Sequence, residues 1–248
     1  MSYSEFKKSI RNLTLFSVLL IFCQFATAEE PKKTLGFHDE SEMGIVLLSG
    51  NANSQSYNLK QTNHYSWGRN ILKFEWKYLN SSTEGTEIAR SWLLGTRFER
   101  EINGHFGLYL GQNLESDIFA GYVQRYNTDI GGKYTIIENK VLNWNGEVGY
   151  RFTVENGRTG QVKQNYLRLY TMVHQNWTET FSTLISIELL PNLDFFDYQF
   201  NSEVSAYVAI NKVFAIKTGY LLKYRKIPVF PATISTDVQY TTALVAKF

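Results

Sequence analysis

The sequence predicts an all-β protein: a transmembrane antiparallel up-and-down β-barrel of the outer-membrane type, with about twelve strands. Three observations lead to this prediction. Beyond residue 35 the chain is a series of runs with a period of two, and it has no long stretch of helical period. These runs exceed the roughly five or six residues usual in soluble strands and match the roughly 9–11 residues of a tilted membrane strand. The last run ends on Phe248, the final residue.

The first segment of the chain has the features of a secretory signal peptide. An apolar core at residues 13–25 follows a basic start, and the small-x-small sequence ATA at 26–28 indicates cleavage after Ala28. We therefore predict a signal peptide over residues 1–28 and a single barrel domain over residues 29–248. The alternative is a membrane anchor, but the apolar core is shorter than the roughly 20 residues of a spanning helix.

Removal of the predicted signal peptide changes the composition of the chain. It removes Cys23, the only cysteine, so that no disulfide framework or thiol nucleophile remains. It also removes three of the 25 basic residues and one of the 23 acidic residues, which leaves the predicted mature chain formally neutral. A neutral chain lacks the basic footprint of a nucleic-acid-binding protein.

Runs of alternating apolar and polar residues follow one another along the rest of the chain. In FAIKTGYLLKY (214–224), Phe214 and Tyr220 share one face, while Lys217 and Lys223 share the other. The first two runs are the least regular. In order, the predicted strands are 42–50, 55–66, 71–79, 88–102, 106–116, 125–137, 141–154, 165–177, 181–190, 198–210, 214–224 and 235–248.

Two folds share this alternation. In a soluble β-sandwich the apolar faces pack together, whereas in an outer-membrane barrel they face lipid and the polar faces line the lumen. Tight turns such as 102–105 and 211–212 alternate with connections that we expect to be long, at 80–87, 115–124, 155–164, 191–197 and 226–235. Large aromatic residues near strand ends resemble an aromatic girdle: Trp67, Trp76, Trp92, Phe106, Trp177, Phe181 and Phe214. Both features favour the barrel.

The closing stretch STDVQYTTALVAKF predicts how the barrel closes and how it is assembled. A closed barrel has no free edge, so its last strand pairs with its first. A final strand with alternating apolar residues and a terminal Phe resembles the signal read by the outer-membrane barrel assembly machinery, with Tyr240, Leu244 and Phe248 as its candidate residues. The expected partners are outer-membrane lipid, this machinery, periplasmic chaperones, and small ions or solutes, but no nucleic acid.

Several stretches resemble one known family. MGIVLLSGNANSQS (43–56) is similar to the opening strand and Ser-Gly-Asn turn of the YdiY-like family of salt-induced outer membrane proteins. Residues 95–134 are similar to its central block, and GEVGYRF and Asp237 also fit, although Ala52 replaces the commoner Thr. The resemblance covers nearly the whole mature chain. It implies an outer-membrane barrel with a domain of unknown function and no catalytic residue to transfer; the link to salt comes from the family label alone.

No segment carries a strong catalytic or metal-binding motif. The four histidines lack metal-ligand spacing, and no phosphate-binding Gly-rich loop is present. His64 and Ser66 resemble the His-x-Ser of lipid A deacylase barrels, but Trp67 stands where those enzymes carry Asn. A cation site would need acidic residues from different loops: Glu115, Asp117, Asp194 and Asp197. We therefore predict no enzyme activity, no cofactor and no metal.

Charged residues on the polar faces are the candidate functional residues, because these faces are expected to line the lumen. They carry both signs, and neighbours such as Lys73–Glu75–Lys77 and Arg97–Glu99 are expected to pair within a narrow interior. About twelve strands enclose more space than eight and less than the sixteen of an open porin. The candidates are Lys73, Glu75, Lys77, Arg97, Glu99, Asp129, Lys133, Glu147, Arg151, Arg168, Glu188, Glu203, Lys217 and Lys223.

The sequence as a whole predicts a narrow pore or structural envelope protein in the outer membrane of a Gram-negative bacterium. The family resemblance alone implies a link to salt or osmotic stress. Balanced lumen charges predict small, weakly ion-selective conductance or none. Two alternatives stay open. One is a lipid-modifying enzyme in the barrel wall, and the other is a surface adhesin or receptor that acts through long external loops.

Overall fold

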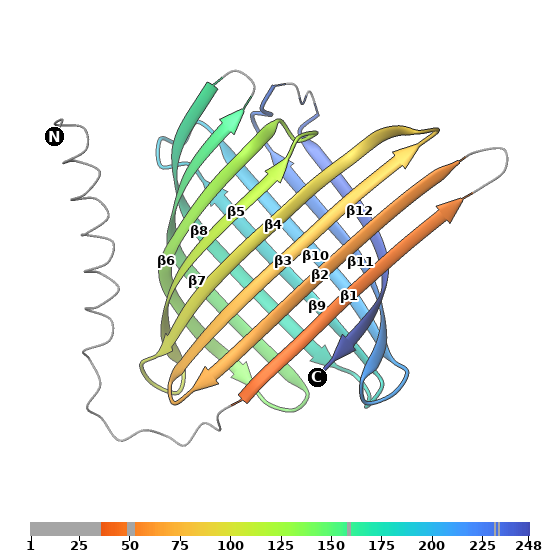
Figure 1. The fold of residues 1–248 in the computed structure, drawn as a ribbon. Helices are drawn as coiled ribbons and strands as arrows, with labels where there is room; N and C mark the ends of the chain where they lie inside the picture. Colours follow the sequence, from red (N-terminus) through yellow and green to blue (C-terminus); the bar gives the residue numbers. More distant parts are fainter. Residues whose placement is uncertain (1–35, 49–52, 158–159, 231, 233) are drawn as a thin grey trace, which may run out of the picture. The chain divides into compact units, whose positions relative to one another are not determined.

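The described part of the chain forms a barrel with a closed strand order. The computed structural model describes residues 36–248 apart from 49–52, 158–159, 231 and 233. These residues form twelve antiparallel strands in which the first strand pairs with the last (Figure 1). The predicted fold class is therefore confirmed. The predicted signal peptide, residues 1–28, lies outside the described residues. Within the described part, no helix has the length and apolarity needed to cross a membrane.

Each strand overlaps the run predicted for it. β1 begins at Gly36 rather than at residue 42, because its first part is held on both sides: Glu40 pairs with Lys247 of β12 and with Thr62 of β2. The strands are β1 Gly36–Leu48, β2 Ser54–Trp67, β3 Asn70–Thr83, β4 Thr86–Glu101, β5 Phe106–Asp117, β6 Tyr122–Glu138, β7 Leu142–Gly157, β8 Gly160–Asn176, β9 Phe181–Pro191, β10 Tyr198–Ala209, β11 Phe214–Arg225 and β12 Thr236–Lys247.

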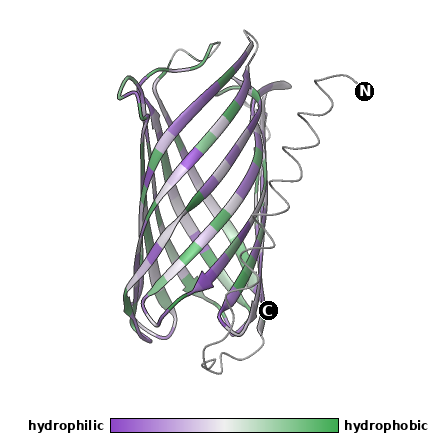
Figure 2. Ribbon diagram, turned by 90° about the vertical axis from the view of Figure 1, so that its left-hand side faces the viewer, coloured by the Kyte–Doolittle hydropathy of each residue, from purple (hydrophilic) through white to green (hydrophobic). Residues whose placement is uncertain are grey.

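Side chains alternate between the outer surface of the barrel and its interior, as the period of two requires. On β11, Phe214 and Ile216 are exposed on the outside, whereas Lys217 is buried inside. On β7, Val148 is 60% exposed, whereas the adjacent Glu147 is 6% exposed. Figure 2 shows hydrophobic and hydrophilic residues interleaved along the strands. The wall thus has an apolar outer surface and a polar interior, as an outer-membrane barrel needs.

The first two strands depart from this rule on their outer surface. Asp39 accepts hydrogen bonds from Gln61 and Asn63, and Ser41 donates one to Gln61. These four residues occupy outward positions, since Glu42, the residue after Ser41, is buried in the interior. Their hydrogen bonds satisfy one another locally. Polar residues at outward positions also explain why the alternation in these two strands is the least regular.

The two ends of the barrel carry different connections. The start of β1 and the end of β12 lie at one end, the terminus end, together with the turns that follow β2, β4, β6, β8 and β10. The connections that follow β1, β3, β5, β7, β9 and β11 lie at the other end, the loop end. Among the described connections of the loop end, the longest are 192–197 and 226–235.

Two connections predicted to be long are shorter than expected, because the strands on either side extend into them. Glu84 and Gly85 alone join β3 to β4, with φ of 50° and 75°, as in a two-residue hairpin turn with both residues in the left-handed region. Only residues 158–159 separate β7 from β8. The polar residues at 80–83 and 160–164 continue the strands instead of forming loops. Polar composition misled the prediction because strands of this barrel extend beyond its apolar part.

The last residue takes part in closing the barrel. Four residue pairs join β1 to β12, the last of them Met43–Leu244. Towards the terminus end, the Phe248 amide donates to the Asp39 carbonyl at 2.9 Å, and the Asp39 amide donates to the Phe248 carbonyl at 3.0 Å. The Phe248 side chain is exposed on the outside. The C-terminal residue therefore extends the closing ladder.

Substitution by Arg is expected to distinguish the two faces of the wall. Val208→Arg puts a charge on the outer surface of β10, where Val208 is half exposed, and should destabilise the barrel by roughly 2–4 kcal/mol in lipid or micelles. Gln239→Arg, at a partly exposed inward position of β12, should cost far less. Urea unfolding of the refolded protein measures both. Equal losses at the two positions would contradict a lipid-facing outer surface.

Deletion of Phe248 is expected to lower the yield of folded barrel more than Phe248→Ser does. The deletion removes both backbone hydrogen bonds to Asp39, whereas the substitution removes only the exposed side chain. If the side chain is also an assembly signal, Phe248→Ser should in turn yield less than Val238→Ser, an exposed position on the same face of β12. Heat-dependent gel mobility of outer membranes gives the folded fraction. Normal yield of the deletion variant would show that the terminal residue is dispensable.

Candidate functional site: the charged interior of the barrel

The interior of the barrel contains a cavity of about 880 Å³, and residues from every strand contribute to its wall. All fourteen charged candidates from the sequence, Lys73 to Lys223, line this cavity. The wall includes further charged residues that were not among the candidates, notably Glu42, Lys60, Arg125 and Arg225. The cavity is therefore the site whose chemistry needs to be explained.

One side of the wall, from β4 to β9, carries a continuous network of ion pairs. Arg168 on β8 binds Glu147 of β7 at 2.5 Å and Glu188 of β9 at 2.6 Å. Glu147 also binds Arg97 of β4 at 2.7 Å, and Glu188 binds Arg151 of β7 at 3.1 Å. Each buried charge thus has a partner of opposite sign, which offsets the cost of taking it out of bulk water.

The same network continues to Glu99 of β4, whose carboxylate is 2.8 Å from Arg97. Its carboxylate binds Lys73 of β3 at 2.6 Å and Lys133 of β6 at 3.1 Å. The pairing expected from sequence is therefore correct for Glu75 with Lys77, at 3.0 Å, and for Arg97 with Glu99, at 2.8 Å. Lys73, however, binds Glu99 instead of Glu75. Partners on neighbouring strands are also within reach, because inward residues of adjacent strands lie side by side around the wall.

Tyr109 organises the centre of this network. The guanidinium of Arg97 lies 3.9 Å from the centre of the Tyr109 ring, a cation–π contact, and Arg168 donates a hydrogen bond to the Tyr109 hydroxyl at 3.1 Å. The ring is buried between the strands' inward faces, where Gly131 and Gly149 lack side chains. A Cβ atom at either glycine would collide with the Tyr109 hydroxyl. The two glycines therefore make the space that this tyrosine fills.

The opposite side of the wall carries a second network. Glu42 of β1 binds Lys60 of β2 and Lys217 of β11, each at 3.0 Å. Lys217 also binds Glu203 of β10 at 3.1 Å. This network connects β2 to β10 across the closing strands. It therefore reinforces the pairing of β1 with β12 from the inside.

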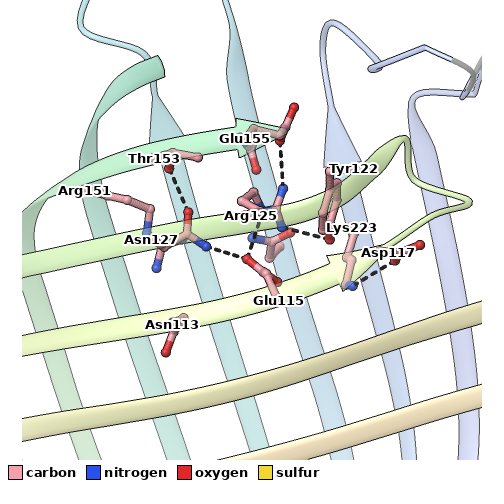
Figure 3. Close-up of polar contacts among 12 residues, drawn as sticks. Asn113, Glu115, Asp117, Tyr122, Arg125, Asn127, Arg151, Thr153, Glu155 and Lys223 are labelled. Atoms are coloured by element: carbon pink, nitrogen blue, oxygen red, sulfur yellow. Dashed lines mark hydrogen bonds and ion pairs between the residues drawn. The ribbon is translucent and has the colours of Figure 1, made fainter. Parts of the chain in front are cut away.

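A third network lies towards the loop end (Figure 3). Arg125 of β6 binds Glu115 of β5 at 2.8 Å, and its guanidinium is 3.5 Å from Glu155 of β7. Glu155, 2% exposed, also accepts from Arg225 of β11 at 2.9 Å. This last contact joins strands that are four apart around the barrel, so it spans a large part of the interior.

A second contact at this level spans the barrel completely. Lys223 of β11 is 4.0 Å from Asp117 of β5, and these strands are six apart in the twelve-strand barrel (Figure 3). The connection 226–235 adds to the same region, because Pro228, Val229 and Ile234 line the cavity. Polar contacts and a loop thus narrow the interior at its loop end.

The acidic residues considered as a cation site do not gather. Glu115 pairs with Arg125, the Asp197 carboxylate is 3.5 Å from Arg225, and Asp194 is exposed. Among the residues that the structure describes, no group of three His, Cys, Asp or Glu side chains could hold a metal ion. The acidic residues of the loop end serve neighbouring cationic side chains instead.

The His64-x-Ser66 pair lies towards the terminus end of β2. His64 lines the cavity opposite Lys73 of β3, and Ser66 is paired with Gly36 and Ile71 in the ladder. Both residues are therefore far along the strand from the loop end. The position differs from that expected of a residue pair acting on lipid of the outer leaflet.

A closed antiparallel barrel with an apolar outer surface and a charged interior cavity defines a barrel of the outer-membrane type. The family model described as a protein of unknown function, DUF481, matches residues 41–248, and the chain belongs to this family. No curated protein matches the sequence.

Solved structures are similar in fold at low sequence identity. An outer membrane channel from Pseudomonas putida F1 aligns with a TM-score of 0.53 and 10% identity, covering 90% of this chain and 100% of its own. The NanC porin aligns with a TM-score of 0.49 and 10% identity, covering 86% of this chain and 98% of its own. The first similarity supports the fold alone.

Removal of one carboxylate from the centre of the β4–β9 network should lower the free energy of unfolding more than removal of a more exposed carboxylate of the lumen. Glu147→Gln leaves Arg97 and Arg168 without their shared partner and should lower the free energy of unfolding by about 1.5–3 kcal/mol. Glu75→Gln, at a side chain that is one-third exposed, should cost less than about 1 kcal/mol. Urea unfolding followed by tryptophan fluorescence compares the two. A larger loss at Glu75 would mean that the buried network contributes little.

Proposed function

We propose that this protein is a narrow pore of the bacterial outer membrane that passes small ions and solutes with weak ion selectivity. The observation that carries the proposal is the cavity of about 880 Å³, whose lining combines charges of both signs. Since no single-sign ring surrounds it, the lining favours neither cations nor anions strongly. The apolar outer surface supports placement in a membrane, with the loop end facing outward and the terminus end in the periplasm.

In the proposed pore, the polar contacts at the loop end limit the flow of ions and solutes. Most ion pairs follow the wall and leave space at the axis, whereas Lys223–Asp117 and Arg225–Glu155 reach between distant strands. A solute that enters from outside meets this level first. We infer that small ions pass it and that large solutes are excluded.

The pore fits the structure better than the two alternatives. An adhesin would need large exposed loops, but Glu84 and Gly85 alone join β3 to β4, and β7 and β8 extend through most of the connection predicted at 155–164. A lipid-modifying enzyme would need a nucleophile and base near the outer leaflet, whereas His64 and Ser66 lie towards the terminus end. The protein is therefore proposed to be non-enzymatic. Its likeness to the YdiY-like proteins, and any role in salt or osmotic stress, rest on the sequence motifs alone.

Planar-bilayer recording of the refolded protein should show small unitary currents with weak ion preference. Lys77→Gln removes a cation whose side chain is 45% exposed in the lumen, and should shift the reversal potential in a salt gradient towards cation preference. Asp237→Asn, at an exposed inward position of β12, should shift it the opposite way.

The double variant Lys223→Gln with Asp117→Asn is the matched control. It removes one charge of each sign, so ion preference should stay the same, but it also removes the contact that spans the interior and should raise the unitary current. Absence of current in all variants would refute a pore and leave a structural envelope role. A porin-like current in the unmodified protein would refute the proposed narrowing.

A further inference from the structure

The seam between β1 and β12 is closed along only part of its length. Pairs between the two strands run from Glu40–Lys247 to Met43–Leu244, and no pair beyond Met43–Leu244 joins them in the described residues. Yet β1 stays paired with β2 as far as Leu48, and β12 is paired with β11 from its first residue. The loop-end halves of the two strands are therefore in regular sheets but not bonded to each other.

The two strands separate at Gly44. A Cβ atom at Gly44 would lie 2.7 Å from the carbonyl oxygen of Thr242, so the backbones are still close at this point. Asn58 of β2 reaches past Gly44 and donates a hydrogen bond across the seam to the Thr241 hydroxyl, at 3.2 Å. Beyond it the loop-end parts of β1 and β2 diverge from β12 (Figure 1).

The gap lies at the level of the apolar outer surface. Ile45 and Leu47 border it on β1, and Val238 and Tyr240 border it on β12; all four are about half or more exposed and point outward. Val46, which occupies an inward position between Ile45 and Leu47, is also apolar and half exposed. The β1 border of the gap is therefore apolar on both faces.

The interior behind the gap differs from the rest of the lumen. Leu221 of β11 lines the cavity there, together with Val229, Ala232 and Ile234 of the connection 226–235. Lys223 lies at the same level. It is the ladder partner of Asp237 and lies 4.0 Å from Asp117. Apolar side chains thus extend from the gap to Lys223, which lies between the carboxylates of Asp237 and Asp117.

Unpaired backbone groups of a strand edge are not left in lipid without partners. A second copy cannot pair with this edge, because both copies insert in the same orientation and their β1 strands would cross at twice the strand tilt, about 70–90°. Water from the lumen can bind the edge, but it leaves the apolar border exposed. An amphiphile covers the apolar border with its alkyl chain, while water that enters from the lumen binds the unpaired backbone groups.

We propose that the gap between β1 and β12 is a lateral binding site for a single-chain amphiphile with a zwitterionic head group. The alkyl chain lies along Ile45, Val46 and Leu221. The phosphate of the head group binds Lys223, and its ammonium group binds the carboxylates of Asp237 and Asp117. The site opens sideways to the membrane and shares Lys223 and Asp117 with the proposed constriction of the axis. Binding in the seam does not require that the pore conducts.

A photolabelling experiment tests the site. The refolded protein is placed in vesicles that contain a little lysophosphatidylethanolamine with a diazirine on its acyl chain, irradiated, and mapped by peptide mass spectrometry. Label should concentrate in 43–47 and 221–234. A thiol cross-link between Ile45→Cys and Thr242→Cys, which would face each other if the ladder continued, should remove most of this label.

The matched control is a cross-link between Ser41→Cys and Ala246→Cys, which already face each other in the closed part of the seam and should leave the label unchanged. If the Ile45/Thr242 variant does not fold, Gly44→Ala decides, since its Cβ pushes β1 from Thr242 and should increase the label. Label spread evenly around the outer surface, or unaffected by closing or widening the seam, would overturn the proposal. Currents recorded from the same samples report on the pore separately.

Discussion

The pairing of the first strand with the last is the constraint on which the rest of this barrel depends. In lipid a sheet must close on itself, because its edges find no other hydrogen-bond partners. The closing pairs also set the phase of the wall: a shift of one residue would turn the charged faces towards lipid. Glu42, which binds Lys60 and Lys217 on the two sides of the seam, ties this phase to the interior charges. Closure and the charged lumen are thus parts of one arrangement.

The arrangement of the same charges explains why side chains line the interior of the barrel and do not fill it. Ion pairs such as Arg168–Glu147 join neighbouring strands and follow the wall. Tyr109 fits into the wall because Gly131 and Gly149 leave room for its ring. A tyrosine opposite ordinary side chains would project into the axis. Gly131 on β6 and Gly149 on β7 therefore keep free the space at the axis that Tyr109 would otherwise occupy.

The period of two was sufficient to predict twelve strands, because it depends only on neighbours along the chain. It was insufficient where polar residues face outward: Asp39 and Gln61 obscured the phase of β1 and β2, so Glu42 and Lys60 were missed. Glu155 was missed because a polar strand end was taken for a loop. Pairs within one strand, such as Glu75–Lys77, were predictable, but partners on other strands were not, since they depend on register between strands. Inward glycines on β6 and β7 were the one available signal for Tyr109.

The two sides of the lumen differ, because the seam between β1 and β12 is closed along only part of its length. From β4 to β9 the wall carries a dense network of paired charges, whereas near β11 and β12 Leu221 and the connection 226–235 add apolar surface beside an open edge. Because β5 and β11 are on opposite walls, these two sides face each other across the cavity. Lys223 and Asp117 meet between these two sides, at the level where polar contacts span the interior. An amphiphile in the seam would compete with Asp117 for Lys223. Its binding would then loosen the contact that restricts the axis, so the lateral site and the axial path share one lysine.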